Sequence, residues 1–176
     1  MTERVGAVVL AAGEGSRFGG PKQQLLLPAV LTRLGRAAVD DVVVVLGAHR
    51  FEVKGARVVV AEEWGRGPGA SLRAGLDALG TDVGVAVACL ADGPLLAPAA
   101  VDRVVAACRS AAGDVVAASY GGARGHPVAL ARSVWDTVPD DGGRSLEAVL
   151  VPCDDLGSPD DVDTPEDLER IRSQLG

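Results

Sequence analysis

The sequence VGAVVLAAGEGSRFGGPKQ (residues 5–23) joins an uninterrupted apolar run to a glycine-rich loop that leads to Lys22. The apolar run at 5–10 is typical of a strand buried on both faces, because such strands lose the alternation of apolar and polar residues. Glycines in the following loop allow backbone N–H groups to approach an anion closely. The stretch therefore predicts a first strand and a loop that either holds phosphate or is an ordinary turn into a helix.

The rest of the chain continues this alternation of apolar runs and helix-like segments. We expect strands at 5–10, 42–46, 57–61, 83–90, 114–119, 127–131 and 148–152. We expect helices at about 29–39, 70–79, 101–109 and 165–175. This order predicts one α/β domain over residues 1–176, with a mostly parallel sheet and helices on both faces. Ligands of such sheets bind beyond the carboxyl ends of the strands, so candidate functional residues are expected just after strands.

Composition and charge narrow the class of protein. Hydrophobic residues make up 48% of the chain and aromatic residues only 3%, so the core must consist of Val, Ala and Leu. The net charge of −7 argues against nucleic acid or a membrane as partner, since both attract basic proteins. The cysteines Cys89, Cys108 and Cys153 form no metal-ligand cluster, which favours reduced thiols. We find neither a signal-peptide pattern nor an apolar run of the ~20 residues that span a bilayer, and expect a cytoplasmic protein.

The glycine-rich loop matches neither common phosphate-binding template. Gly13, Gly15 and Gly19 are spaced one residue too widely for a dinucleotide fingerprint. The P-loop template fails as well, because Gln23 follows Lys22 where that motif has Ser or Thr. The residue types in the loop still suit a triphosphate, since a lysine and an arginine accompany the glycines.

Several polar residues outside the glycine-rich loop are candidates for chemistry. Asp92 comes just after the run 83–90 and is either a magnesium ligand or part of an Asp-Gly-Pro turn. Asp161 and Asp163 precede a helix-start signal and are either metal ligands or members of a solvated acidic loop. His126 precedes Pro127 and is either a turn residue or a substrate contact. The residues alone leave each pair of alternatives open.

Three motifs in one order carry a family resemblance: LAAGEGSRFGGPK at 10–22, GHPVAL at 125–130 and DVDTPEDL at 161–168. Together they resemble the MobA-like NTP transferases, and within them the molybdenum cofactor cytidylyltransferase branch. The resemblance covers nearly the whole chain. It implies a Rossmann-like three-layer sandwich of the nucleotide-diphospho-sugar transferase type. The segments after Lys22 and around 140–150 are shorter than is usual in that family.

The resemblance also implies roles for individual residues. Arg17, Lys22 and Asp92 would be catalytic, and Asp92 with Asp163 would hold Mg²⁺. The position of Asp163, directly before Thr-Pro, is preferred to that of Asp161. His126 would contact the acceptor. The nucleotide-binding residues would be Leu10, Ala11, Ala12, Gly13, Gly15, Ser16, Arg17, Lys22, Gly69 and Ser71.

The implied reaction is an in-line attack of the acceptor's phosphate on the α-phosphorus of a nucleoside triphosphate, with release of pyrophosphate. A phosphate monoester has a second pKa of about 6, so the attacking group needs no general base at neutral pH. The implied substrates are CTP and a phosphorylated, molybdopterin-type acceptor. A transient contact with a molybdoenzyme or its chaperone is implied as well.

Other readings share the same motifs. A guanylyltransferase that uses GTP with the same cofactor, or a transferase that acts on a sugar phosphate, would have this fold. A module that binds a nucleotide or cofactor without catalysis is a further alternative, although such a module has less need of metal-binding carboxylates.

Overall fold

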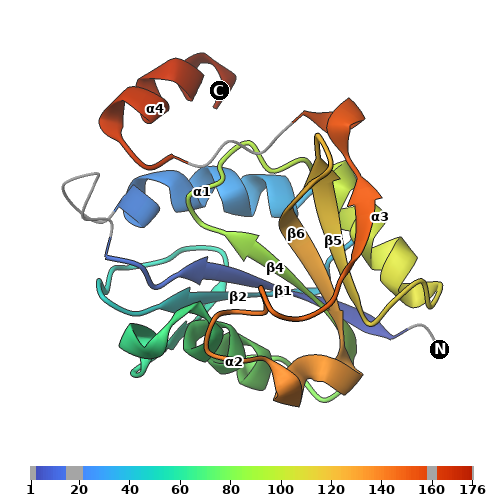
Figure 1. Ribbon diagram of the computed structural model, residues 1–176. Helices are drawn as coiled ribbons and strands as arrows, with labels where there is room; N and C mark the ends of the chain where they lie inside the picture. The colour runs from blue at the N-terminus through green and yellow to red at the C-terminus, as the bar shows by residue number, and fades with distance from the viewer. Residues whose placement is uncertain (1–2, 15–21, 158–161, 176) are drawn as a thin grey trace.

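The computed structural model describes residues 3–14, 22–157 and 162–175, and within these ranges seven strands form one sheet (Figure 1). Their order across the sheet is β3-β2-β1-β4-β6-β5-β7. The strands are β1 (Arg4–Ala11), β2 (Asp41–Leu46), β3 (Arg57–Val60), β4 (Val83–Leu90), β5 (Val115–Tyr120), β6 (Ala123–Ala131) and β7 (Val149–Pro152). The helices are α1 (Lys22–Leu34), α2 (Pro68–Ala78), α3 (Pro98–Arg109) and α4 (Pro165–Ile171). Short 3₁₀ helices are η1 (Trp64–Arg66), η2 (Arg132–Thr137), η3 (Asp154–Leu156) and η4 (Arg172–Gln174).

The sheet is parallel except at β6, which runs antiparallel to both β4 and β5. A two-residue turn, Gly121–Gly122, joins β5 to β6, and both glycines have positive φ (59° and 80°). Two consecutive positive φ angles are what a tight hairpin turn requires, and glycine adopts them at little cost. The hairpin lengthens β6, which begins at Ala123 rather than at 127 as predicted, so His126 lies within a strand.

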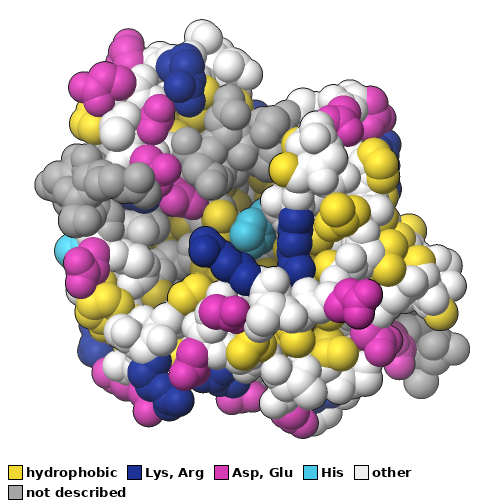
Figure 2. Space-filling model, in the orientation of Figure 1, with side chains coloured by type: hydrophobic (Ala, Val, Ile, Leu, Met, Phe, Trp, Pro, Cys, Tyr) yellow, Lys and Arg dark blue, Asp and Glu magenta, His cyan; other side chains and the backbone are white. Residues whose placement is uncertain are grey.

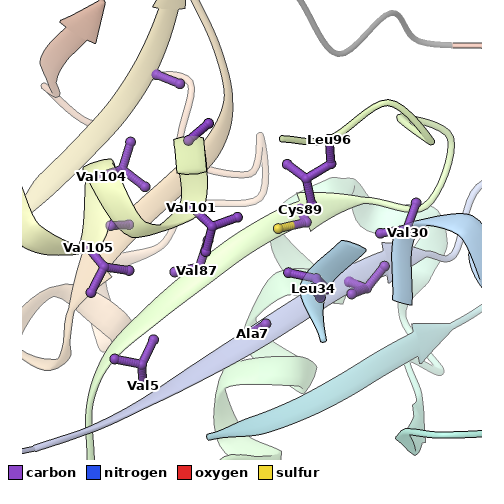
Figure 3. Packing of buried hydrophobic residues seen from close by; sticks show 14 of the residues in the cluster. Val5, Ala7, Val30, Leu34, Val87, Cys89, Leu96, Val101, Val104 and Val105 are labelled. Atoms are coloured by element: carbon purple, nitrogen blue, oxygen red, sulfur yellow. The ribbon is translucent and has the colours of Figure 1, made fainter. Parts of the chain in front are cut away.

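Helices cover both faces of the sheet, as predicted. Figure 1 shows α1 and α2 on opposite sides of it. The core on the α1 and α3 side includes Val9, Val30 and Val101, whereas the core on the α2 side includes Val8 and Leu76. Figure 3 shows part of the first of these clusters, which consists of Val, Ala, Leu and Cys side chains, Cys89 among them. No helix in the described ranges has the length and apolar character needed to cross a bilayer.

Helix α1 differs most from its predicted bounds, because it runs over Lys22–Leu34 instead of about 29–39. Pro28 lies inside the helix, where it removes one backbone hydrogen bond and where the sequence suggested a boundary. The spacing of Leu26, Val30 and Leu34 nevertheless presents one continuous stripe, and all three are buried. The early start of the helix places Lys22 and Gln23 in its first turn.

Helix α4 and the residues before it pack against α1. Thr164 and Asp167 form the predicted capping box, and Pro165 is the first helical residue. Val162 and Ile171 pack with Leu26 of α1 in a small separate cluster. This packing fixes the residues just before α4, including Asp163, against the start of α1.

Helix α2 lies unusually close to the sheet at Gly75. A Cβ atom there would lie 2.8 Å from Val45 Cγ2 and still closer to Val8 Cγ1. Both valines are fully buried in the middle of the sheet, so neither can move away. Glycine at this position therefore sets the distance between helix and sheet.

We expect Gly75→Ala to lower the free energy of unfolding by about 1–2 kcal/mol, because overpacking outweighs the gain in helix propensity. Urea denaturation measures this change. Gly35→Ala is the matched control, since a Cβ at Gly35 meets its nearest neighbour, the Thr32 carbonyl, at an ordinary 3.4 Å. A stabilised Gly75→Ala variant would contradict the packing argument.

Candidate functional site

The site lies where β1 and β4 end side by side. Leu10 of β1 pairs with Leu90 of β4, and the Ala91 N–H donates to the Leu10 carbonyl (3.0 Å). Asp92 follows immediately. Its carbonyl accepts a hydrogen bond from the Val162 N–H (2.8 Å), so the carboxyl-terminal segment is bound to the same edge of the sheet.

Lys22 lies between two carboxylates that are distant in the chain. Its Nζ is 3.0 Å from Asp92 Oδ2 and 2.9 Å from Asp163 Oδ1, and it donates to the Val162 carbonyl at 2.6 Å. Although burial lowers the pKa of Lys22, the hydrogen bonds to Asp163 and Asp92 outweigh it and raise the pKa above its ordinary value. The lysine is therefore charged, and only 6% of it is exposed.

The two carboxylates and the Val162 carbonyl form an oxygen-rich donor set that converges on one point. Mg²⁺ and similar hard cations prefer such oxygens and commonly take only one or two carboxylates, with phosphate oxygens and water as further ligands. The described ranges contain no group of three or more His, Cys, Asp or Glu residues suited to a metal. In the structure these oxygens surround the Lys22 ammonium, and a divalent cation held by Asp92 and Asp163 stays a prediction.

A cavity of about 320 Å³ adjoins this cluster. It is lined by Leu10, Ala12, Gly13, Gln23, Trp64, Pro68, Ser71, Leu90 and Asp92. We call it the smaller cavity. Apart from the carboxylate, its polar side chains are Gln23 and the buried Ser71. Among the described residues, the Gln23 Oε1 is the buried side-chain polar atom that has no hydrogen-bond partner, and such an orphan costs about 1–3 kcal/mol.

A second cavity of about 690 Å³, the larger cavity, opens beside the first and shares Leu10 and Leu90 with it. Its lining includes Tyr120, Arg124, His126 and Arg144 above an aliphatic floor. Figure 2 shows a hollow in this face of the molecule with a histidine side chain inside it and Lys or Arg side chains on either side. The larger cavity therefore combines an apolar floor with a positively charged rim.

The larger cavity holds its polar side chains firmly. Arg124 donates to the carbonyls of Leu146 (2.8 Å) and Gly143 (3.1 Å), which ties β6 to the loop that carries Arg144. The Tyr120 hydroxyl donates to the His126 carbonyl (3.0 Å). Burial lowers the pKa of the His126 ring to about 4, helped by the charges of the two arginines and opposed by Asp92. The ring is thus neutral at physiological pH.

The structure brings together part of the predicted set. Leu10, Ala12, Gly13 and Ser71 line the smaller cavity, and His126 lines the larger one. Lys22, Asp92 and Asp163 meet in one cluster, while their roles toward a triphosphate and a metal stay predictions. Gly15, Ser16, Arg17 and Asp161 lie outside the described residues.

Three predicted nucleotide-binding residues, Ala11, Lys22 and Gly69, do not line either cavity. Ala11 is buried at the end of β1. Gly69 donates its N–H to the Asp140 carbonyl (2.9 Å), and a Cβ there would overlap the Pro139 carbonyl. The structure thus gives Gly69 a packing role at the start of α2, because its amide already has a protein partner.

The sequence-based prediction missed many of the residues that line the cavities, among them Gln23, Trp64, Arg124 and Arg144. A signal existed for each of these four. Gln23 is next to Lys22, Trp64 is one of only two tryptophans and opens a glycine-rich segment, and Arg124 is two residues before His126. Arg144 is the single basic residue of the short segment at 140–150.

Comparison with known proteins supports the resemblance seen in the motifs. The model of the MobA-like NTP transferase domain matches residues 7–150. Nicotine blue oxidoreductase of Paenarthrobacter nicotinovorans is 33% identical over 204 residues, which cover 95% of this chain and 96% of that protein. The alignment is longer than this chain of 176 residues, so it includes insertions in the relative.

Two solved structures have the same fold over nearly their whole length. One is the homologue of Mycobacterium tuberculosis Rv0371c from Mycobacterium sp. strain JC1, with 26% identity, a TM-score of 0.80 and coverage of 99% of this chain and 98% of that one. The other is Rv0371c of M. tuberculosis H37Rv in complex with manganese, with 27% identity, a TM-score of 0.77 and coverage of 97% and 98%. With the family model matched over most of its length, this chain belongs to the MobA-like NTP transferase family.

Proposed function

We propose that this protein transfers CMP from CTP to the phosphate of a molybdenum cofactor-type acceptor and releases pyrophosphate. The observation that carries the proposal is the cluster of Lys22, Asp92 and Asp163 beside two adjoining cavities, the smaller of which Asp92 lines, in a chain of this family. A nucleotidyl transfer needs two substrates side by side and a cation-binding site next to the reacting phosphate, and in our proposal the cluster provides that site.

The smaller cavity suits the nucleotide. Its aliphatic and tryptophan lining fits the faces of a base, and Gly13 leads into the glycine-rich loop. Gly15, Ser16 and Arg17 of that loop would contact the phosphates, as the family motif implies. Lys22 adds a buried positive charge next to them.

Asp92 and Asp163 would hold a divalent cation, Mg²⁺ in our proposal. The manganese complex of Rv0371c supports a divalent ion at this fold. When bound, such an ion neutralises negative charge on the triphosphate oxygens. The charges of Lys22 and the two carboxylates are held in place before substrate binds, because Ile171 of α4 and the preceding Val162 pack on Leu26 of α1.

The larger cavity suits the acceptor. Arg124 and Arg144 provide charge for an anionic group, and the apolar floor takes a flat organic body. The neutral His126 ring donates or accepts a hydrogen bond without adding charge. A phosphate monoester that enters here is already a dianion at pH 7, so attack on the α-phosphorus needs no protein base.

One observation favours a second candidate, an oxidoreductase. The relative that is 33% identical over almost the entire chain is named nicotine blue oxidoreductase. In that case the larger cavity would hold the compound that is reduced. Guanylyl transfer and sugar-phosphate nucleotidyl transfer share the proposed cluster and differ only in which molecules the two cavities accept.

A substrate panel separates these functions. We expect pyrophosphate release from CTP with a molybdopterin-type acceptor in the presence of Mg²⁺, and slower release with GTP or with sugar phosphates. The same protein is tested for consumption of NADH or NADPH with nicotine blue. Reduction without pyrophosphate release would replace the proposal with the oxidoreductase. Metal-dependent thermal stabilisation by a triphosphate without any turnover would indicate a binding module.

We expect Lys22→Ala and Asp92→Ala each to lower turnover 10²–10³-fold, since removing one preorganised charge costs about 3 kcal/mol of transition-state stabilisation. Circular dichroism should show both variants folded. Lys54→Ala and Asp77→Ala are matched controls, because Lys54 and Asp77 are exposed and distant from both cavities. Near-normal turnover in either site variant would refute the assignment.

His126 makes a separate prediction about pH. Its pKa is about 4 in the folded protein and about 6.5 in an unfolded chain, so between these values the unfolded state binds the extra proton. Stability should therefore rise with pH across this window on account of His126. Urea denaturation at pH 4.5, 5.5 and 7 should show a shallower rise for His126→Gln than for the unaltered protein. Equal slopes would mean that the ring titrates normally.

A further inference from the structure

The side chain of Gln23 raises a question that the proposed function leaves open. It is only 6% exposed, lies in the first turn of α1 and lines the smaller cavity. Its Nε2 donates to the Gly13 carbonyl at 3.4 Å, a long hydrogen bond. Its Oε1 is buried and has no partner among the described residues. A buried acceptor with no protein partner, in the wall of a cavity, is suited to a donor on a ligand.

The orientation of this amide is fixed by its neighbour. Rotating the amide by 180° would bring Oε1 against the Gly13 carbonyl, so two acceptors would face each other and the existing hydrogen bond would be lost. The hydrogen bond to Gly13 therefore occupies the Nε2 side of the amide, and Oε1 remains as the buried acceptor without a partner, in a side chain that lines the smaller cavity.

The surroundings restrict the kind of donor. Phosphate oxygens are acceptors and would be repelled by Oε1. Most other side chains in the lining are aliphatic or aromatic, including Leu10, Trp64 and Leu90, and such walls suit the faces of a planar base. The edges of bases carry N–H donors only where an exocyclic amino group or a protonated ring nitrogen is present.

We infer that Gln23 determines base specificity: its Oε1 accepts a hydrogen bond from the exocyclic amino group of the nucleotide's base. The inference rests on the proposed function, in which the smaller cavity holds a nucleoside triphosphate. Cytosine has this amino group, whereas uracil has a carbonyl oxygen there that would face Oε1 directly. The same contact separates guanine from hypoxanthine, so the inference does not depend on whether the protein uses CTP or GTP.

Isothermal titration calorimetry with two matched ligand pairs, CTP with UTP and GTP with ITP, tests the inference on the full chain. For the pair that the protein binds, the amino-bearing member should bind about 10–100-fold more tightly, the loss expected when a buried acceptor is left unpartnered. Gln23→Leu should reduce this difference to about threefold or less. Gln24→Leu, the same substitution at the exposed next residue of α1, should leave the difference unchanged.

Two further measurements distinguish recognition of the base by Gln23 from other roles of this side chain. Thermal unfolding without nucleotide should show Gln23→Leu at least as stable as the unaltered protein, because the orphaned acceptor is removed. Gln23→Met provides a second apolar variant of similar length if Gln23→Leu does not fold. Titration with dCTP and dGTP tests the ribose, whose hydroxyls are further donors on a nucleotide.

Three results would overturn the inference while leaving the proposed function intact. The first is equal binding of both members of a pair. The second is an equal loss of affinity for both members in Gln23→Leu, which would indicate that Gln23 only positions the Gly13 loop. The third is a Gln23-dependent preference for the ribonucleotide over its deoxy form. Absence of binding by any triphosphate with Mg²⁺ would overturn the proposed function and the inference with it.

Discussion

The buried ammonium of Lys22 is the interaction on which the site depends. It is within 3.0 Å of Asp92 and Asp163 and bonds the Val162 carbonyl, so it joins α1, the end of β4 and the segment before α4. Removing charged groups from water costs much of the free energy that their mutual attraction returns, so such a cluster contributes little net stability. The cluster instead fixes the positions of these segments. Removing one charged residue would leave the remaining charges buried without a counter-charge, so the three distant segments stay together at this point.

The two cavities near this cluster are lined by different kinds of side chain, and the difference follows from the elements that build them. The smaller one lies between the β1 loop, α1 and the start of α2, where mainly aliphatic residues, Trp64 and Pro68 line a largely apolar space. The larger one lies over the antiparallel β5–β6 hairpin, whose arginine is tied to the loop at 143–146. A parallel sheet brings strand ends to one edge, and the reversed β6 adds a second, cationic wall there.

Membership in the MobA-like family accounts for the arrangement of motifs, while the 33% identical oxidoreductase shows that this scaffold is associated with more than one kind of activity. The fold therefore does not settle the reaction by itself. The side chains that line the cavities and form the Lys22 cluster are what distinguishes the alternative functions. In the proposed nucleotidyl transfer, Asp92 and Asp163 would hold the cation, and the arginines of the larger cavity would bind an anionic acceptor.

The sequence by itself determined the strands, the order of elements and the capped start of α4, because burial on both faces and helix capping leave local patterns of residue type. It did not determine the bounds of α1, since packing of Leu26, Val30 and Leu34 overrides the local effect of Pro28. Only the tertiary structure decided that Lys22 lies between two carboxylates, one of them 141 residues away, and that Gln23 keeps an unpartnered oxygen. Which way a side chain points depends on the rotation of its helix against the sheet, and that rotation is set by contacts distant in the chain.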